Sequence, residues 1–477
     1  MDKRKIDEPP LCVDLDGTVI KTDTLYESVL RLIKTAPHLS LLLPFWLLKG
    51  KAHFKERVAK HIDLDATLLP YNEPFLAYLR EQRELGRALV LATATNEKFA
   101  HKIASHLGIF DGVLASNESE NLSGPNKLAR LQLEFGDKGF DYAGNSTADL
   151  RIFPHARRAV LVNAARRLKA AAEKCSKVER VFEREPATLV AYVRLIRLHQ
   201  WSKNILVFLP LFLGHKIGDP RLLVQAAMAF TAFGLCASGT YVLNDLLDLQ
   251  SDREHPRKRR RPLADGAIPL QIGLLVVPLL MLGGFGFALL LPGNFIGVLA
   301  LYIGSTTLYS LAIKRMAILD VMFLAGLYTL RIIGGAEAVQ VVPSFWLLAF
   351  SIFFFLSLAM VKRYTEMTSS EQKPGMYVAG RGYAAEDKGI LESLGSSSGY
   401  TAILVLALYI DSDDVRSQYT NPEAIWLVCP VVLYWISRVW LKAKRGEMHD
   451  DPVIFALKDP WSLWMGGLLL LILLYAL

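Results

Sequence analysis

The sequence predicts an α/β domain at the N-terminus, followed by an all-α bundle of about nine membrane-spanning helices. Of the 477 residues, 52% are hydrophobic. The mean hydropathy of +0.28 is too high for a soluble protein of this length. The apolar residues are also unevenly placed, because the first 190 residues are mixed in character whereas the rest alternates apolar runs with short charged loops. A soluble domain joined to a membrane domain accounts for both observations.

Cysteines and charge exclude several classes of function. The four cysteines are scattered without CxxC spacing, which predicts neither a zinc site nor a disulfide framework. The first ten residues, MDKRKIDEPP, lack the apolar core of a secretion signal, so none is expected. The net charge of +8 lies largely in loops beside apolar runs. This placement favours anionic lipid headgroups over nucleic acid as the partner of the basic residues.

The α/β domain begins with a short apolar strand in the stretch 11–20, LCVDLDGTVI. The strand ends in Asp14 and Asp16, and Gly17 and Thr18 form the turn that follows. Two carboxylates one residue apart at a strand end can bind Mg²⁺ while one of them attacks phosphorus. The sequence therefore predicts phosphoryl chemistry at this position.

The DxDGT motif after an apolar strand resembles the haloacid dehalogenase (HAD) phosphatase superfamily, which implies a Rossmann-like fold. By this resemblance Asp14 is the nucleophile and Asp16 the general acid and base. A second strand, ALVLATAT, supplies Thr93 as the phosphate-binding hydroxyl. GPNKLARL supplies Lys127, which would neutralise the nucleophile and the phosphate.

The stretch DYAGNSTADL completes the resemblance with Asp149, which would support a magnesium site together with Asp14 and Asp16. Asn145 departs from the family pattern, where an aspartate ligand is usual. An asparagine offers one oxygen and no charge. A catalytically silent, regulatory domain is therefore the alternative to an active phosphatase.

The predicted limits are 1–164 for the HAD-like domain, 165–190 for a basic helical linker and 191–477 for the membrane domain. Within the first domain, about 23–85 would form a small helical cap. The cap contains an apolar run, HLSLLLPFWLLKG. It is too short to span a bilayer, so it would either lie on the membrane surface or pack inside the cap.

Apolar runs of spanning length predict the membrane topology. Basic residues gather in the loops on one side, as at 253–261 and at 442–445. The positive-inside rule therefore places the N-terminal domain on the cytoplasmic side of a multi-pass membrane protein. We expect the membrane to be a bacterial inner membrane. The nine expected spans are roughly 197–215, 221–244, 270–291, 294–312, 317–337, 343–361, 396–411, 424–441 and 460–477.

An acidic motif follows the second of these spans. Asn244, Asp248 and Asp252 recur every four residues, and Asp245 falls three before Asp248, so a continuous helix would present all four on nearly one face. Oxygen ligands gathered beside a membrane indicate a hard divalent cation, most often Mg²⁺ carrying a substrate diphosphate. The basic run that follows, ending in Arg261, would either bind phosphate or serve as a topology signal.

The NxxxDxxxD motif resembles the first aspartate-rich motif of the UbiA superfamily of intramembrane prenyltransferases. The family's second motif corresponds to YSLAIKRMAILD, with Tyr309, Lys314 and Asp320, followed by Arg331 in the next span. Only one clear aspartate is present there, in place of a full DxxxD. This departure points away from the prenyltransferases that act on aromatic acceptors.

Two further stretches, RLHQWSKN with Lys203 and Asn204 and LAMVKRYTEM with Lys362 and Arg363, resemble the decaprenyl-phosphate phosphoribosyltransferase branch. The resemblance implies phosphoribosyl diphosphate as donor, a polyprenyl phosphate lipid as acceptor and Mg²⁺ as cofactor. An aromatic or quinone-precursor prenyltransferase remains the alternative. The expected substrate-binding residues are Asp245, Lys203, Asn204, Arg261, Tyr309, Lys314, Asp320, Arg331, Lys362 and Arg363.

Overall fold

A computed structural model describes residues 8–183, 186–369, 381–412, 415, 419–448 and 451–477. Its internal contacts divide the chain into two compact units. Unit 1 consists of Met1–Ile196 and Tyr241–Val277, and unit 2 of Arg197–Thr240 and Pro278–Leu477. The HAD-like motifs and the first acidic motif thus belong to the same unit.

Unit 1 contains a six-stranded sheet in the order β3-β2-β1-β4-β5-β6, and all neighbouring strands are parallel. The central strand β1 is apolar and fully buried, as expected of a parallel strand covered on both faces. The strands are β1 (Leu11–Val13), β2 (Leu89–Asn96), β3 (Gly112–Ser116), β4 (Asp141–Gly144), β5 (Ala159–Val162) and β6 (Val178–Phe182).

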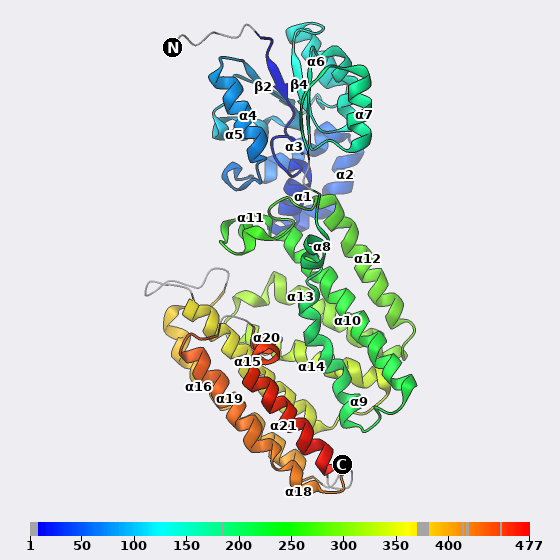
Figure 1. The fold of residues 1–477 in the computed structure, drawn as a ribbon, viewed down its shortest axis with the longest axis vertical. Helices are drawn as coiled ribbons and strands as arrows, with labels where there is room; N and C mark the ends of the chain where they lie inside the picture. The colour runs from blue at the N-terminus through cyan, green and yellow to red at the C-terminus, as the bar shows by residue number, and fades with distance from the viewer. Residues whose placement is uncertain (1–7, 184–185, 370–380, 413–414, 416–418, 449–450) are drawn as a thin grey trace. The chain divides into compact units, whose positions relative to one another are not determined.

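Two hydrophobic cores lie on the two faces of this sheet, since alternate residues of a strand point in opposite directions. Leu11 and Val13 belong to one core and Cys12 to the other. Helices α4 (Glu73–Glu84) and α5 (Glu97–Leu107) cover the first face, and α6 (Pro125–Phe135) and α7 (Arg166–Cys175) cover the second (Figure 1).

The strand order places the predicted nucleophile where open α/β sheets bind their ligands. The chain leaves β1 for β2 and β3 on one side and then returns to β4 on the other side. Ligands of open α/β sheets bind at the carboxyl ends of the strands where the strand order reverses. Asp14 and Asp16 directly follow β1 and therefore lie at this switch point.

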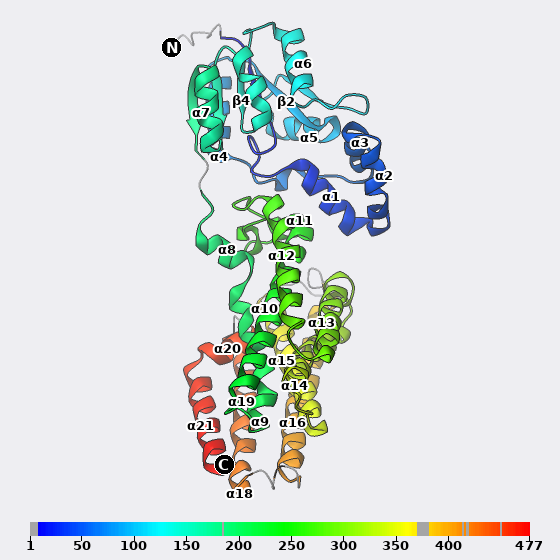
Figure 2. The ribbon, with the colours of Figure 1, turned by 90° about the vertical axis from the view of Figure 1, so that its right-hand side faces the viewer.

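The segment between β1 and α4 forms a small helical layer. It consists of α1 (Thr24–Thr35), a 3-10 turn, α2 (Leu43–Leu48) and α3 (Lys51–His61) (Figure 2). Side chains of α1 and α3 form a separate apolar cluster, to which Trp46 of α2 also contributes. Leu41, Phe45 and Leu48 of the apolar run nevertheless stay exposed.

The segment 165–190 differs from the helical linker expected there. Helix α7 packs on the sheet, and β6 adds a sixth strand beside β5. Its consecutive residues Glu179 and Arg180 are charged and exposed, so the strand carries no continuous apolar run that would predict it. A further helix, α8 (Leu189–Leu195), follows.

The described residues include seven helices long and apolar enough to cross a membrane, or eight if a pair bent by 80° forms one span. The predicted fold class is confirmed, with nine as an approximate number. The spanning helices are α10 (Pro220–Leu247), α12 (Leu270–Ala288), α13 (Gly293–Leu311), α14 (Leu319–Val339), α15 (Phe345–Ser369), α16 (Lys388–Ile410) and α19 (Val428–Lys444), and the bent pair is α20 (Pro452–Lys458) with α21 (Pro460–Ala476).

The first expected span, 197–215, is instead a 3-10 helix over Leu198–Phe208 and a short helix α9 (Leu209–Leu213). Its polar residues Lys203 and Asn204 are buried within unit 2. The packing is close, because a side chain at Gly335 of α14 would come within 2.0 Å of the Val207 carbonyl oxygen. Small residues allow such close approach between segments in membrane proteins.

Candidate active sites

The predicted nucleophile Asp14 is paired with the predicted lysine. Lys127, near the start of α6, donates from Nζ to Asp14 Oδ1 at 2.8 Å, and both side chains are buried. Lys127 Nζ also lies 3.1 Å from the hydroxyl oxygen of Tyr142 on β4. Two residues that are 113 positions apart in the sequence therefore meet at the carboxyl end of the sheet.

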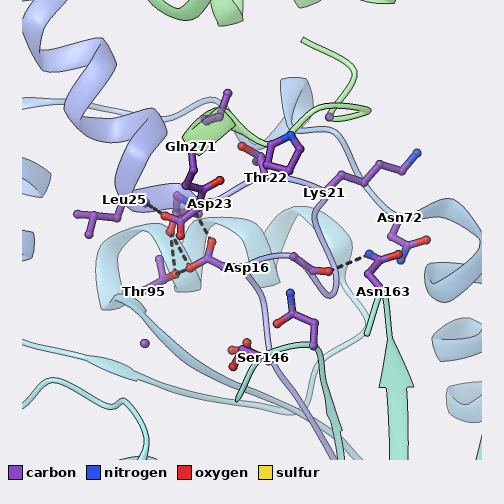
Figure 3. A pocket seen from close by; sticks show the side chains of 18 of the residues that line it. Asp16, Lys21, Thr22, Asp23, Leu25, Asn72, Thr95, Ser146, Asn163 and Gln271 are labelled. Carbon is purple, nitrogen blue, oxygen red and sulfur yellow. Dashed lines mark hydrogen bonds between the residues drawn. The ribbon is translucent and has the colours of Figure 1, made fainter. Parts of the chain in front are cut away.

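The predicted general acid Asp16 is held by two threonines. It accepts hydrogen bonds from the Thr24 backbone N–H at 2.8 Å and from the Thr95 hydroxyl at 2.8 Å (Figure 3). The Thr24 side chain adds a third bond at 3.2 Å. These contacts fix the orientation of the Asp16 carboxylate at the start of α1.

Sequence reasoning missed Thr95. The predicted phosphate-binding residue, Thr93, is fully buried on β2, and its hydroxyl accepts from the Thr95 backbone N–H at 3.1 Å. Thr95 lines the cavity that contains Asp14 and Asp16, and Thr93 is not among the lining residues. The two threonines lie two residues apart on β2 and so point to the same face, which is why the sequence pattern alone does not distinguish them.

Asp149 organises the loop after β4. Its Oδ2 accepts from the backbone N–H groups of Asn145 and Ser146 at 3.1 and 2.9 Å, and its Oδ1 accepts from the Tyr142 hydroxyl at 2.9 Å. A chain of contacts therefore runs from Asp149 through Tyr142 and Lys127 to Asp14. In this arrangement Asp149 positions the loop that carries Asn145.

Burial governs the electrostatics of this site. Loss of water raises the pKa of Asp14 to about 6, against the attraction of Lys127, which lowers it. Burial likewise raises the pKa of Asp16 to about 6, and the nearby Asp23 adds to the rise. Two buried carboxylates with raised pKa values favour a cation beside them, because a positive charge restores the interactions lost with water.

The residues present fit a magnesium ion. Asp14, Asp16 and Asn145 line one cavity and offer hard oxygen ligands, the type that Mg²⁺ prefers. In the described part of the chain no group of three or more His, Cys, Asp or Glu side chains is placed to hold a metal ion. The remaining ligands would therefore come from phosphate oxygens and water, as is usual for Mg²⁺.

The cavity has a volume of about 1000 Å³. This is large compared with the space that a phosphate group alone needs, and it falls in the range of sites for small organic ligands. Polar side chains around it include Lys21, Lys55, Asn72, Asn163 and Gln271.

The first acidic motif of unit 1 bends at its middle residue. Helix α10 ends at Leu247 and α11 (Leu249–Glu254) begins after Asp248. The hydrogen bonds from Asp248 N–H to Asn244 O and from Asp252 N–H to Asp248 O keep the helical spacing, at 2.9 and 2.8 Å. The predicted common face is thus largely preserved through the bend.

Basic side chains neutralise this acidic face in the structure. Arg261 Nη1 binds Asp245 Oδ1 at 3.0 Å and Asp252 Oδ2 at 2.6 Å. Lys34 of α1 binds Asp248 Oδ1 at 2.6 Å. Burial raises the pKa of Asp252, while Arg261 opposes the rise. Among the described residues no three acids are placed to hold a metal ion here, so a divalent cation at this face would take further oxygen ligands from Asn244 and a substrate diphosphate.

Unit 2 brings the second motif into one buried cluster. Arg363 of α15 is fully buried, and its Nη2 lies 2.8 Å from Oδ2 of the fully buried Asp320 on α14. The same guanidinium donates to the Tyr309 hydroxyl at 3.3 Å. Tyr383, which sequence reasoning did not select, donates to Asp320 Oδ1. Lys314 lies in the turn between α13 and α14.

The remaining predicted residues form two other groups in unit 2. Arg331 donates to Asn204 Oδ1 at 2.9 Å and to the Tyr302 hydroxyl at 2.7 Å. Lys203 and Lys362 both bind Asp451 Oδ2, each at 2.9 Å.

Asp451 was missed because it lies nearly 90 residues beyond Lys362, next to a proline that starts α20. An aspartate before a proline at a helix start reads as an N-cap. Asp451 does cap α20, accepting from the Val453 N–H, so the sequence carried only this part of its role.

Comparison with known proteins assigns the membrane domain that carries these residues to a protein family. The UbiA prenyltransferase family matches residues 205–458. The "uncharacterized protein y4nM" of Sinorhizobium fredii is 38% identical over 463 residues, covering 96% of this chain and 89% of that protein. Decaprenyl-phosphate phosphoribosyltransferase of Mycobacterium tuberculosis is 34% identical over 199 residues, which cover 41% of this chain and 66% of that protein.

Solved structures resemble each part separately. A UbiA homolog from Archaeoglobus fulgidus, bound to DMAPP and Mg²⁺, covers 60% of this chain and 97% of its own, with 14% identity and a TM-score of 0.46. A phosphoserine phosphatase in apo form covers 37% of this chain and 94% of its own, with 14% identity and a TM-score of 0.27. The family assignment is based on the sequence match, which spans more than half of the chain. The chain belongs to the UbiA prenyltransferase family.

Proposed function

We propose that this protein transfers phosphoribose from phosphoribosyl diphosphate to a polyprenyl phosphate, and that its N-terminal domain then removes the 5'-phosphate of the lipid-linked product. The similarity of its membrane domain to a decaprenyl-phosphate phosphoribosyltransferase carries the first half of this proposal. The pairing of Asp14 with Lys127 beside a cavity carries the second half. The protein would lie in the bacterial inner membrane with its N-terminal domain in the cytoplasm.

In the transfer step the bond from ribose C1 to the diphosphate breaks, and a bond from C1 to the acceptor's phosphate oxygen forms. Asn244, Asp248 and Asp252 would hold Mg²⁺, which would draw charge from the departing diphosphate. Arg261 and the buried Arg363 are guanidinium groups suited to bidentate contacts with phosphate. The acceptor is already an anion, so this step needs no dedicated base.

The unit 2 groups would divide the remaining binding tasks. The cluster of Tyr309, Asp320 and Arg363 would bind the sugar phosphate end of the donor. Lys203 and Lys362 share one carboxylate, Asp451, so one extra positive charge remains for an anionic substrate. Arg331, fixed by Asn204 and Tyr302, would present its planar cation to a phosphate oxygen.

In the second step Asp14 attacks the 5'-phosphorus and the bond from phosphorus to O5' breaks. Asp16 gives a proton to the departing oxygen, and its pKa of about 6 suits this transfer near neutral pH. Water then hydrolyses the phosphoryl-aspartate with Asp16 as base, which releases inorganic phosphate. The tether between the domains raises the effective concentration of the lipid product.

The test uses detergent-purified full-length protein, polyprenyl phosphate and phosphoribosyl diphosphate labelled in the ribose. Wild type should place label in lipid as polyprenyl-phospho-ribose. Asp248→Asn should abolish lipid labelling, and Asp14→Asn should label lipid but accumulate the 5'-phosphorylated form. Glu254→Gln is the matched control, since Glu254 is an exposed acid two residues beyond Asp252.

Two outcomes would contradict the proposal. Absence of label in lipid, with prenyl diphosphate donating to a phenolic acceptor, would favour an aromatic prenyltransferase. Lipid labelling in which wild type and Asp14→Asn give the same phosphorylated product would show the N-terminal domain to be a silent module.

A further inference from the structure

The wall of the phosphatase cavity contains a segment that no phosphatase motif predicts. The segment Asp265–Gln271, with the exception of the buried Ile268, lines the same cavity as Asp14 and Asp16, although it lies some 250 positions later in the chain. Figure 3 shows Gln271 among the lining side chains, on the side of Leu25 and Asp23. The segment joins the loop after the acidic motif to α12, whose first residue, Leu270, is also part of the wall.

Close packing fixes this segment to the catalytic loop. Gly266 has a φ of +77°, and a side chain on it would lie 2.6 Å from Cβ of Lys21. Both the backbone conformation and the space therefore require glycine at this position. Lys21 follows Asp16 by five residues, so the segment Asp265–Gln271, called the wall below, contacts the loop that carries the proposed catalytic carboxylates.

A buried ion pair anchors the segment from the other side. Arg253 donates from Nε to the carbonyl oxygen of Ala264 at 2.7 Å. Its other nitrogens bind both carboxylate oxygens of Glu27 on α1, at 2.9 and 2.6 Å. The guanidinium thus connects the residue just before the wall to the helix that starts beside Asp16. A wall held in this way is preorganised for recognition.

The wall carries a negative charge that would affect the selectivity between the proposed donor and the proposed lipid product. The proposed donor and the proposed lipid product both carry a ribose 5-phosphate, so the reacting group cannot distinguish them. They differ at C1, where the donor carries a highly charged diphosphate and the product a singly charged diester. Asp265 on the wall is a carboxylate that lines the cavity and would repel the diphosphate more strongly than the diester.

We propose that Asp265–Gln271 is the specificity wall of the phosphatase, which admits a phosphomonoester carried on a membrane lipid and rejects soluble sugar phosphates that bear a diphosphate. The inference rests on the proposed function. It assigns Asp265 to charge discrimination and Gln271 to binding of the sugar. Because the wall continues into a membrane-spanning helix, the lipid end of the substrate would leave the cavity along α12.

The test measures phosphate release by full-length protein in lipid vesicles, with two substrates compared side by side. One is phosphoribosyl diphosphate, and the other is the phosphorylated lipid that Asp14→Asn accumulates. Wild type should strongly prefer the lipid. Asp265→Asn, which retains an oxygen to accept the Ala267 N–H, should raise kcat/KM for phosphoribosyl diphosphate about tenfold, as expected for one removed repulsion near a surface.

Gln271→Ala should raise KM for the lipid substrate about three- to tenfold with little change in kcat, because it removes binding and leaves the reacting groups in place. Gln250→Ala on α11 and Glu84→Gln at the end of α4 are matched controls, since neither residue lines this cavity. A thermal unfolding midpoint of Asp265→Asn equal to that of wild type would show that this variant is folded.

The possible results separate this inference from the proposed function. Equal turnover of both substrates by wild type, or an unchanged preference in Asp265→Asn, would contradict the selectivity role of Asp265–Gln271. Either result would be compatible with the two-step reaction. Absence of phosphate release from either substrate would overturn the phosphatase and the wall together.

Discussion

Arg253 and Glu27 form a bidentate ion pair between α11, which carries the last residue of the acidic motif, and α1, which follows the loop with the proposed nucleophile Asp14. Both side chains are buried, and 226 positions separate them in the sequence. The pair therefore connects the region of the predicted metal site at Asp248 and Asp252 with the region of the predicted metal site at Asp14 and Asp16.

Breaking this pair should destabilise unit 1. Arg253→Met leaves a buried carboxylate without its partner, and loss of one member of a buried pair costs about 3–5 kcal/mol. We expect a clear fall in the midpoint of thermal unfolding of the purified protein. The double variant Glu27→Leu/Arg253→Met should recover most of the loss, since it removes both charges. A double variant as unstable as the single one would contradict a role of the ion pair itself.

Lys127→Met should reduce phosphatase turnover roughly 100-fold, the usual effect of removing one preorganised charge from a transition state. The cause is the loss of the cation 2.8 Å from Asp14, where charge develops on the phosphoryl group. Phosphate release from the lipid substrate measures the effect. Transfer of label to lipid should be unchanged in the same sample, and a parallel loss of transfer would indicate misfolding.

Magnesium binding to the phosphatase site should weaken as the pH falls through about 6. The pKa of Asp14 is raised to about 6, so its carboxylate is ionised above this value and protonated below it. A protonated carboxylate is a poor ligand, and because the pKa of Asp16 is also raised to about 6, affinity should fall by about tenfold to 100-fold for each pH unit below 6. Isothermal titration of Asp248→Asn, which disables the other site, would measure this. Constant affinity between pH 5 and 7 would contradict it.

Arg363→Lys should abolish most of the transferase activity while phosphatase activity persists. The substitution keeps the positive charge but loses the planar fork that reaches both Asp320 and Tyr309. Misplacement of a binding group by about 1 Å can cost roughly 100-fold in rate. The labelling assay measures transfer, with Arg445→Lys at the end of α19 as the control. Full transfer by Arg363→Lys would show that the charge alone is sufficient.

The sequence by itself was sufficient for the class of each part, and it also proposed several of the side chains that the structure brings together. Buried parallel strands are recognisable as short apolar runs, and membrane helices as long ones, because burial in protein or lipid selects composition locally. The motif residues Asp14 and Asp16 were recognisable for a related reason, since a strand and the turn after it lie within ten residues. The four-residue spacing of Asn244, Asp248 and Asp252 likewise needed only helical geometry.

Tertiary structure decided the features that depend on distant partners. Strand β6 has a charged, half-exposed sequence and is a strand only because β5 offers it an edge. Asp451 meets Lys203 and Lys362, and Asp265–Gln271 reaches the phosphatase cavity, through contacts between segments far apart in the chain. No local pattern encodes such pairs, because their free energy arises only when packing removes water from both partners at once.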